Sequence, residues 1–171
     1  ITVGGTGKTP LVISLVESLR ERGLSPGVIS RGYGGKASSY PCSVEGHGPE
    51  DVGDEPFMIA ERTGVPVVVD PDRVAAAQKL IAEHQVDVIV SDDGLQHYRL
   101  GRNIEIVVID GQRGLGNHQC LPVGPLREPE KRLESVDYII INCGAASCRN
   151  NAEQDSDSQF QSRSDSNRAH G

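Results

Sequence analysis

Aromatic residues are scarce in this chain of 171 residues, which has no tryptophan, two phenylalanines and four tyrosines. Stacking platforms for nucleic-acid bases or for sugars need more aromatic side chains than this. A surplus of positive charge is also lacking, because 17 Lys and Arg residues stand against 24 Asp and Glu, a formal net charge of -7. Nucleic-acid backbones are neutralised by clustered Lys and Arg, so we expect no nucleic-acid partner.

Long hydrophobic runs are missing as well. No uninterrupted apolar run approaches the roughly 20 residues that a membrane-spanning helix needs. The four cysteines lack the spacing of a zinc ribbon or a C-x-x-C motif, so we expect passive thiols in a reducing cytosol. With 36% hydrophobic and 24% charged residues, the composition is typical of a soluble globular protein.

What the chain does contain is an alternation of two patterns. Short runs rich in Val and Ile predict buried strands over residues 27–30, 65–69, 86–90, 104–109 and 138–141. Amphipathic stretches between them predict helices over residues 11–19, 55–62 and 74–84. This alternation predicts an α/β fold, a mostly parallel sheet with helices on both faces.

Three of these predicted strands end in a carboxylate, at Asp70, Asp92 and Asp110. Open parallel sheets bind ligands at the carboxyl ends of their strands, so a row of acids there suits a metal–nucleotide complex. Each of these aspartates could equally begin a turn.

The composition changes near the end of the chain. After residue 143 the only large apolar side chain is Phe160, set among Ser, Asn, Asp, Gln and Arg. Such a segment buries too little surface to offset its ordering entropy. We therefore expect a folded domain over residues 1–142 and a polar, disordered tail over residues 143–171. Because the chain starts at Ile1, we expect a fragment of a longer protein.

A glycine-rich loop follows the residues Ile-Thr-Val and precedes the first predicted helix, which is the strand–loop–helix context of a phosphate-binding Walker A loop. Glycines turn backbone N–H groups toward phosphate oxygens, and the helix N-terminus adds a favourable dipole. The usual first glycine of the motif falls at Thr2. We predict an ATP site in a P-loop NTPase-like fold, with nucleotide contacts from Val3, Gly4, Gly5, Thr6, Gly7, Lys8, Thr9 and Pro10.

A second motif of a nucleotide site lies at the end of the predicted strand over residues 86–90. Asp92 and Asp93 follow it in the manner of a Walker B strand, whose carboxylate orients Mg²⁺. Two adjacent carboxylates favour a cation nearby, since like charges repel. Together with the Thr9 hydroxyl, these acids predict a Mg²⁺ site.

Five motifs in order resemble the tetraacyldisaccharide 4′-kinase family, over residues 1 to about 142. They are Val-Gly-Gly-Thr-Gly-Lys-Thr-Pro at 3–10, Ser-Arg-Gly-Tyr-Gly-Gly at 30–35, Val-Gly-Asp-Glu-Pro at 52–56, Asp-Asp-Gly-Leu-Gln-His-Tyr-Arg-Leu at 92–100 and Pro-Leu-Arg-Glu at 125–128. The resemblance implies transfer of the γ-phosphoryl group of ATP to the 4′-hydroxyl of a tetraacylated disaccharide 1-phosphate, giving lipid IVA in lipid A biosynthesis. It also implies the cytoplasmic face of the bacterial inner membrane, reached through segments that this chain lacks. A second domain, whose histidine pairs with the catalytic aspartate, cannot be assigned here.

The resemblance also implies roles for single residues. Asp54 matches the family's catalytic aspartate and would accept the proton of the sugar hydroxyl, although the same position suits a helix N-cap. Arg73, Arg127 and Glu128 match positions implicated in activity, with solvated loop charges as the alternative. Glu55 and His97 are candidates for the metal site, or for a first-turn acid and a structural histidine.

Two other interpretations of these motifs stay open. Another P-loop small-molecule kinase would share the glycine-rich loop and the acid-tipped strand. An inactive nucleotide-binding fragment would bind an ATP analogue without transfer. We expect the parent protein to be an ATP-dependent lipid kinase, and this piece of it to bind nucleotide weakly and turn over poorly.

Overall fold

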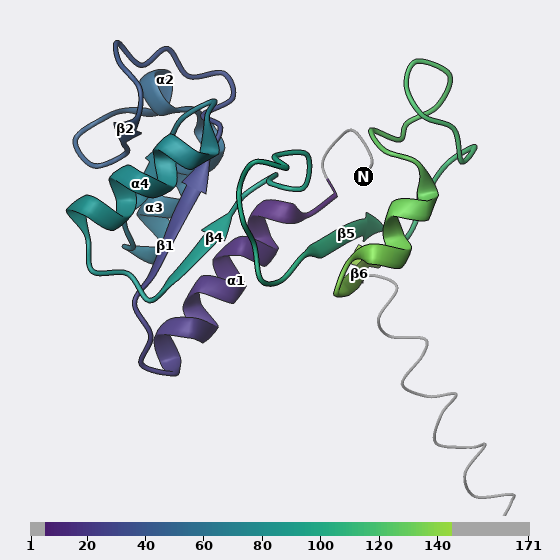
Figure 1. Ribbon diagram of the computed structural model, residues 1–171, viewed down its shortest axis with the longest axis horizontal. Helices are drawn as coiled ribbons and strands as arrows, with labels where there is room; N and C mark the ends of the chain where they lie inside the picture. The colour runs from purple at the N-terminus through teal and green to yellow at the C-terminus, as the bar shows by residue number, and fades with distance from the viewer. Residues whose placement is uncertain (1–5, 145–171) are drawn as a thin grey trace, which may run out of the picture.

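The computed structural model describes residues 6–144 and places the strands of this part in two sheets (Figure 1). The larger sheet has four strands in the order β2-β3-β1-β4, in which β1, β3 and β4 are parallel and β2 is antiparallel to β3. The smaller sheet is the parallel pair β5 and β6. The strands are β1 (Pro26–Ser30), β2 (Cys42–Ser43), β3 (Val67–Val69), β4 (Val88–Ser91), β5 (Ile106–Asp110) and β6 (Tyr138–Asn142).

The three predicted helices are present, together with two short ones that the sequence pattern did not indicate. The five are α1 (Lys8–Glu21), α2 (Pro49–Val52), α3 (Asp54–Thr63), α4 (Arg73–Glu83) and the 3-10 helix η1 (Glu130–Ser135). All five predicted strands are also found, with ends shifted by up to two residues. β3 starts later than predicted because Pro66 has no N–H to donate to a neighbouring strand.

Helices cover both faces of the larger sheet, as predicted. All five residues of β1 are buried, so successive side chains of this strand point into two separate cores. Val28 packs with side chains of α1 and α3, including Val16 and Ile59. Ile29 points the other way and packs against Leu80 of α4. This two-sided burial fixes the carboxyl ends of the parallel strands, where Asp70 and Asp92 follow β3 and β4.

The smaller sheet is less covered than the larger one. Tyr138, Ile139 and Ile141 of β6 are all exposed. The pair is tied to the start of α1 by the last residue of β6, because the Asn142 side chain donates a hydrogen bond to the Thr6 carbonyl at 3.2 Å. Among the predicted loop residues, Val3, Gly4 and Gly5 lie outside the described residues. So does nearly all of the predicted tail, from residue 145 onward.

Candidate nucleotide site

The described part of the phosphate loop leads directly into α1. Gly7 caps the helix with φ 87, a left-handed conformation that glycine adopts without strain, and Lys8 is the first helical residue. The first turn of α1 carries no acidic residue, so the positive end of its dipole is left for an anion. The Thr6 Oγ1 atom is buried and has no hydrogen-bond partner among the residues that the structure describes.

Asp93 is the point at which two cations of the site converge. Lys8 Nζ lies 3.4 Å from Asp93 Oδ1, and Arg127 Nη1 donates to Asp93 Oδ2 at 2.7 Å. Burial pushes the pKa of Asp93 up, but the hydrogen bond from Arg127 and the charge of Lys8 outweigh it and hold that pKa below its usual range. The predicted loop lysine, Walker carboxylate and arginine therefore meet in one place.

Asp92 lies beside this pair in a different environment. It is 2% exposed, and its Oδ1 atom has no hydrogen-bond partner in the described part of the chain. Burial, followed by the negative charges of Glu55 and Asp93, raises the pKa of Asp92 to about 6. A buried carboxylate with an unpartnered oxygen is an energetic cost to the ligand-free fold, and a bound cation would remove that cost.

The family's chemistry expects Mg²⁺ at this position, and the donor set fits it. The Asp92 Oδ1 atom has no hydrogen-bond partner among the described residues, and Thr9, buried in the first turn of α1, carries a hydroxyl. Within residues 6–144, no three His, Cys, Asp or Glu side chains gather closely enough to hold a metal unaided. That pattern is typical of Mg²⁺, which keeps several waters and shares its ligands with substrate phosphates.

The cost of ionised Asp92 leads to a prediction about stability. The folded pKa of Asp92, about 6, exceeds the ordinary aspartate value of 3.8, so the contribution of Asp92 favours folding below pH 3.8 and is lost as the pH rises through 6. Asp92→Asn does not titrate, and at pH 7 we expect it to be more stable than the wild type by about 1–2 kcal/mol. Part of the gain is offset because the buried amide also lacks partners. Urea denaturation of both proteins between pH 4 and pH 8 measures the difference.

The matched control for this prediction is the neighbouring carboxylate. Asp93→Asn removes the partner of Lys8 and Arg127, so we expect it to lower stability at pH 7. If Asp92→Asn also lowered stability at pH 7, or if its difference from the wild type did not grow with pH, the buried-charge account of Asp92 would be wrong.

Arg73 is almost completely buried, at 2% exposed, rather than open to solvent. It is the first residue of α4, whose N-cap Asp72 accepts a hydrogen bond from the Val74 N–H at 3.0 Å. Its guanidinium donates to the carbonyl of Asp70 at 2.7 Å and to that of Asp92 at 3.3 Å. Arg73 therefore joins the ends of β3 and β4, which holds Asp92 in place from behind.

Asp54 and Glu55 form the exposed first turn of α3. The N-cap of this helix is Gly53 and no side chain caps it, so the alternative interpretation of Asp54 as an N-cap is wrong. Asp54 is left as an exposed carboxylate at the positive end of a helix, where a negative charge is stabilised. Glu55 lies near enough to Asp92 for its charge to raise the pKa of that residue. Glu55 therefore lies on the side of the site that holds Asp92, and Asp54 is its neighbour in the chain.

Glu128 and His97 are held by the segment that follows the Walker carboxylates. Glu128 is 6% exposed and accepts hydrogen bonds from Gln96 Nε2 at 3.1 Å and from the Tyr98 hydroxyl. Burial, and then the positive charges of Arg73 and Arg31, lower the pKa of His97, so this imidazole is mainly neutral at pH 7. A neutral imidazole retains the lone pair that a hydrogen-bond acceptor or a metal ligand needs.

Comparison with known proteins identifies the group to which this arrangement belongs. A family model described as "LpxK: Tetraacyldisaccharide-1-P 4'-kinase" matches residues 1–170. The chain belongs to this family. The match bears out the resemblance on which the residue assignments rest.

Individual relatives carry the same name. The tetraacyldisaccharide 4'-kinase of Pseudomonas fluorescens strain SBW25 is 57% identical over 150 residues, which are 87% of this chain and 44% of the relative. That of Shewanella sp. strain W3-18-1 is 61% identical over 146 residues, 85% of this chain and 43% of the relative. The chain therefore spans less than half the length of the curated relatives it matches.

A solved structure has the same fold. An "apo" form LpxK from Aquifex aeolicus, described as in complex with ATP, superposes with a TM-score of 0.75 at 30% identity, covering 84% of this chain and 46% of that one. The mostly parallel α/β architecture predicted from sequence is thereby confirmed for this member of the 4′-kinase family.

Asn142 is a site residue that sequence reasoning missed. Its side chain holds the Thr6 carbonyl, and a Cβ atom added to Gly7 would collide with it. The available signal was its position, since Asn142 ends β6 at the carboxyl edge where ligands of parallel sheets bind. In this family member, the phosphate loop is thus supported from the smaller sheet.

Gly53 provides a prediction about how Asp54 is positioned. It has φ 92 and ψ 151, a region open essentially to glycine alone, and an added Cβ would lie 2.6 Å from the Tyr33 carbonyl oxygen. We expect Gly53→Ala to lower the free energy of unfolding by about 1–3 kcal/mol more than Gly46→Ala does. Gly46 also has a positive φ, 79, but open space around it. Thermal unfolding of both variants checks this, and equal losses would contradict it.

Proposed function

We propose that this chain is the nucleotide-binding part of an ATP-dependent kinase that phosphorylates the 4′-hydroxyl of an acylated disaccharide 1-phosphate, giving lipid IVA. The observation that carries this proposal is the convergence of Lys8 and Arg127 on Asp93, beside the free N-terminus of α1. When nucleotide binds, both cations can exchange part of this contact for phosphate oxygens. The family membership of the chain supplies the acceptor class.

The phosphate loop and the two Walker carboxylates divide the task of holding ATP and Mg²⁺. Backbone N–H groups of α1 and the Lys8 ammonium neutralise the phosphates. Thr9, Asp92 and Asp93 are the residues that would hold the cation. When bound, Mg²⁺ neutralises charge on the phosphate oxygens during transfer. Asp92 is held for this purpose by the Arg73 guanidinium, which acts on the carbonyl behind it.

The transfer step needs a base, and Asp54 is our candidate. The 4′-oxygen forms a bond to the γ-phosphorus while the bond from that phosphorus to the bridging oxygen breaks. ADP leaves with the electron pair, and the hydroxyl proton goes to the Asp54 carboxylate. Arg127 stabilises the charge that develops on the transferred group. Glu128 is buried, and each of its oxygens accepts a hydrogen bond, one from Gln96 and one from Tyr98, so we assign it a positioning role.

Glu55 and His97 complete the assignment. Glu55 adds negative charge on the side of Asp92 and increases the demand for a cation there. His97 is kept neutral by burial and by neighbouring arginines, which suits a hydrogen bond to a metal-bound water.

The acyl chains of the proposed substrate place the reaction at a membrane surface. We propose the cytoplasmic face of the bacterial inner membrane, with membrane contact made outside this stretch of sequence. Within residues 6–144, no helix combines the length and the apolarity needed to cross a bilayer. We also propose that this part alone binds nucleotide weakly and turns over poorly, because it spans less than half the length of the relatives it matches.

The acceptor distinguishes this proposal from the alternative of another P-loop kinase. The test offers γ-labelled ATP to a protein in which this chain replaces the matching part of the Shewanella relative, with a panel of acceptors. The panel contains the tetraacylated disaccharide 1-phosphate, its deacylated form, a nucleoside and a simple sugar. Label in the acylated disaccharide alone supports the proposal. Preferential labelling of any other acceptor contradicts it.

A further inference from the structure

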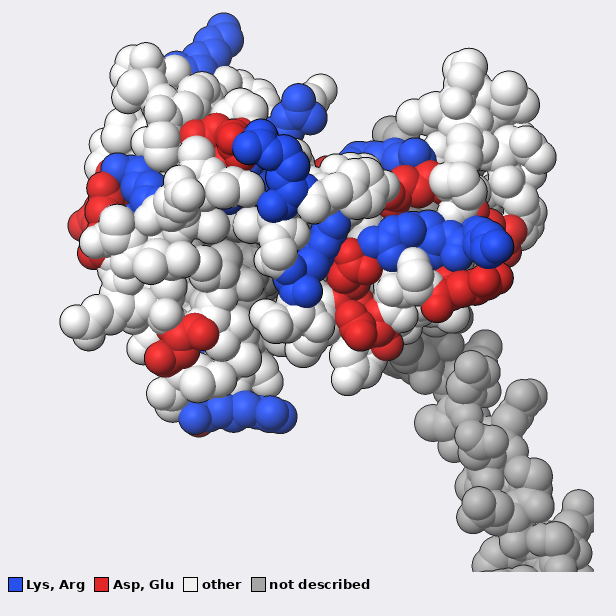
Figure 2. Space-filling model, in the orientation of Figure 1, with Lys and Arg blue, Asp and Glu red and all other residues white. Residues whose placement is uncertain are grey.

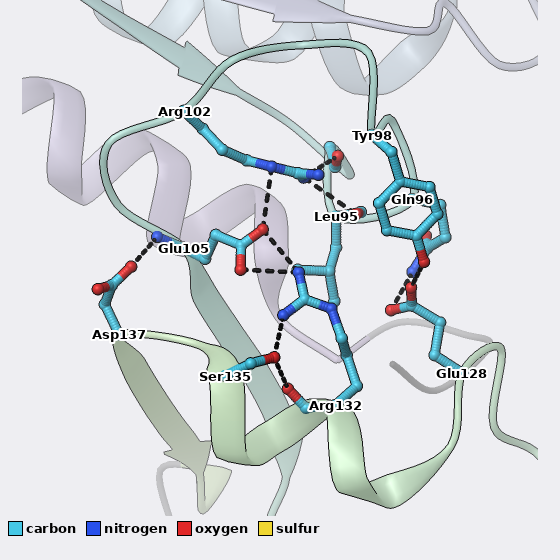
Figure 3. A network of polar contacts seen from close by, with 10 residues as sticks. Leu95, Gln96, Tyr98, Arg102, Glu105, Glu128, Arg132, Ser135 and Asp137 are labelled. Atoms are coloured by element: carbon cyan, nitrogen blue, oxygen red, sulfur yellow. Dashed lines mark hydrogen bonds and ion pairs between the residues drawn. The ribbon is translucent and has the colours of Figure 1, made fainter.

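Glu105 joins two arginines from different segments of the chain (Figure 3). Arg132 Nη2 lies 2.7 Å from both Glu105 carboxylate oxygens, and Arg102 Nε lies 2.9 Å from Oε1. The three side chains are only 14–21% exposed. Figure 2 shows acidic and basic side chains lying against one another over this part of the molecule. We call Arg102, Glu105 and Arg132 the clasp.

One arm of the clasp reaches the loop that carries the Walker carboxylates. Arg102 Nη1 donates to the carbonyls of Gly94 and Leu95, at 2.9 and 3.0 Å, immediately after Asp93. The same guanidinium lies 5.8 Å from the ring centre of Tyr98, close enough for a cation–π contact. Arg102 therefore fixes the backbone on which Asp93 sits in the left-handed conformation, at φ 50.

The other arm reaches the segment that carries Arg127 and Glu128. Arg132 lies in η1, which starts two residues after Glu128, and it also donates to Ser135 in the same helix. Glu105 itself begins the approach to β5 and is anchored there, because its N–H donates to Asp137 Oδ2 at 2.7 Å. The clasp is thus fixed to the smaller sheet and holds both of the segments that meet at the Arg127–Asp93 ion pair.

We propose that Glu105 is a positioning residue that sets the relative placement of Asp93 and Arg127, and so the response of the nucleotide site to Mg²⁺. The proposal deepens the proposed function and rests on it. Two arginines share one partly buried carboxylate, so removing its charge takes the common ion-pair partner from both guanidiniums. The 94–102 loop and η1 are then free to separate, so the Asp93 carboxylate and the Arg127 guanidinium are no longer held next to each other.

The first test uses the 171-residue chain and needs no nucleotide. Amide hydrogen exchange is measured for the wild type, for Glu105→Gln and for Glu134→Gln. Glu134 is an exposed acid in η1 outside the clasp, so it is the matched control. We expect Glu105→Gln to speed exchange about 10-fold in residues 94–102 and 130–135, with α1 and α4 unchanged. Glu134→Gln should leave all of these rates unchanged.

The second test measures the affinity of the same proteins for ATP with and without Mg²⁺. We expect Glu105→Gln to reduce the Mg²⁺-dependent gain in affinity about 10-fold, as loss of an outer support for metal ligands does. Affinity without Mg²⁺, which depends on the phosphate loop, should change less than about twofold. Arg132→Lys keeps the positive charge but loses the bidentate contact with Glu105. We therefore expect its Mg²⁺-dependent gain in ATP affinity to lie between that of the wild type and that of Glu105→Gln.

The outcomes of the two tests separate the clasp from the proposed function. Unchanged exchange in residues 94–102 of Glu105→Gln, or a loss of affinity that is equal with and without Mg²⁺, overturns the positioning role. If the wild type gains nothing from Mg²⁺, the proposed function fails. The exchange pattern alone then decides whether the clasp holds the two segments.

Discussion

Asp54→Asn is expected to slow phosphoryl transfer about 1,000-fold in the chimaera with the Shewanella relative, within the range that a positioned general base contributes. Asparagine has nearly the same shape but cannot take the proton of the 4′-hydroxyl. Because Asp54 is exposed and caps nothing, the change leaves α3 and the phosphate loop intact. The loss therefore falls on kcat, whereas the KM for ATP stays within about twofold.

The control is Glu61→Gln, which makes the same chemical change at an exposed position of the same helix. It should alter neither kcat nor KM. Steady-state transfer of labelled phosphate measures both constants for each variant. A decrease in kcat of less than about tenfold for Asp54→Asn would contradict its assignment as the base.

Lys8→Ala is expected to weaken ATP binding by the 171-residue chain about 100-fold. Hydrogen bonds to charged groups contribute about 1.5–3 kcal/mol, and each 1.4 kcal/mol is tenfold in affinity, so losing the ammonium from the phosphates accounts for this loss. The same change removes one of the two cations on Asp93, whose remaining partner is Arg127. Isothermal titration with a non-hydrolysable ATP analogue measures the effect.

Lys36→Ala is the control for this experiment, since Lys36 is an exposed lysine in the loop before β2. Its affinity for nucleotide should match that of the wild type. If the ATP affinity of Lys8→Ala lay within about fivefold of that of the wild type, Lys8 and the phosphate loop would not bind the phosphates of ATP as proposed.

The sequence pattern was sufficient where the relevant contacts are local. The positions of strands, helices and the phosphate loop were predicted from the hydrophobic period and from glycine placement, and the structure confirms the strands and helices that lie within residues 6–144. The ion pair between Lys8 and Asp93 was not predicted, because the sequence motifs assigned the two residues only to the same nucleotide site.

Contacts between distant segments could not be predicted in this way. Asn142 contacts Thr6, which is 136 positions away in the sequence, and Arg132 contacts Glu105, which is 27 positions away. No local sequence pattern predicts either contact. Arg73 carried the expectation of a solvated or substrate-facing arginine. The structure buries it instead, because two strand ends present carbonyls that its guanidinium can satisfy.

The position of the α3 N-cap is a further difference between the sequence-based prediction and the structure. An aspartate before Glu-Pro suits a helix N-cap by residue type, yet Gly53 takes that position with a backbone conformation that sequence alone does not specify. Because Gly53 is the N-cap, Asp54 lies inside the first turn of α3 as an exposed carboxylate.

The central claim is that Lys8, Asp92, Asp93 and Arg127 form a Mg²⁺·ATP site. The most direct measurement is the affinity of the 171-residue chain for ATP, titrated with Mg²⁺ and in its absence. The account predicts saturable binding that strengthens with Mg²⁺ in the wild type, and loss of that Mg²⁺ dependence in Asp92→Asn. Binding with the same affinity in both conditions, or no binding at millimolar ATP, would contradict it.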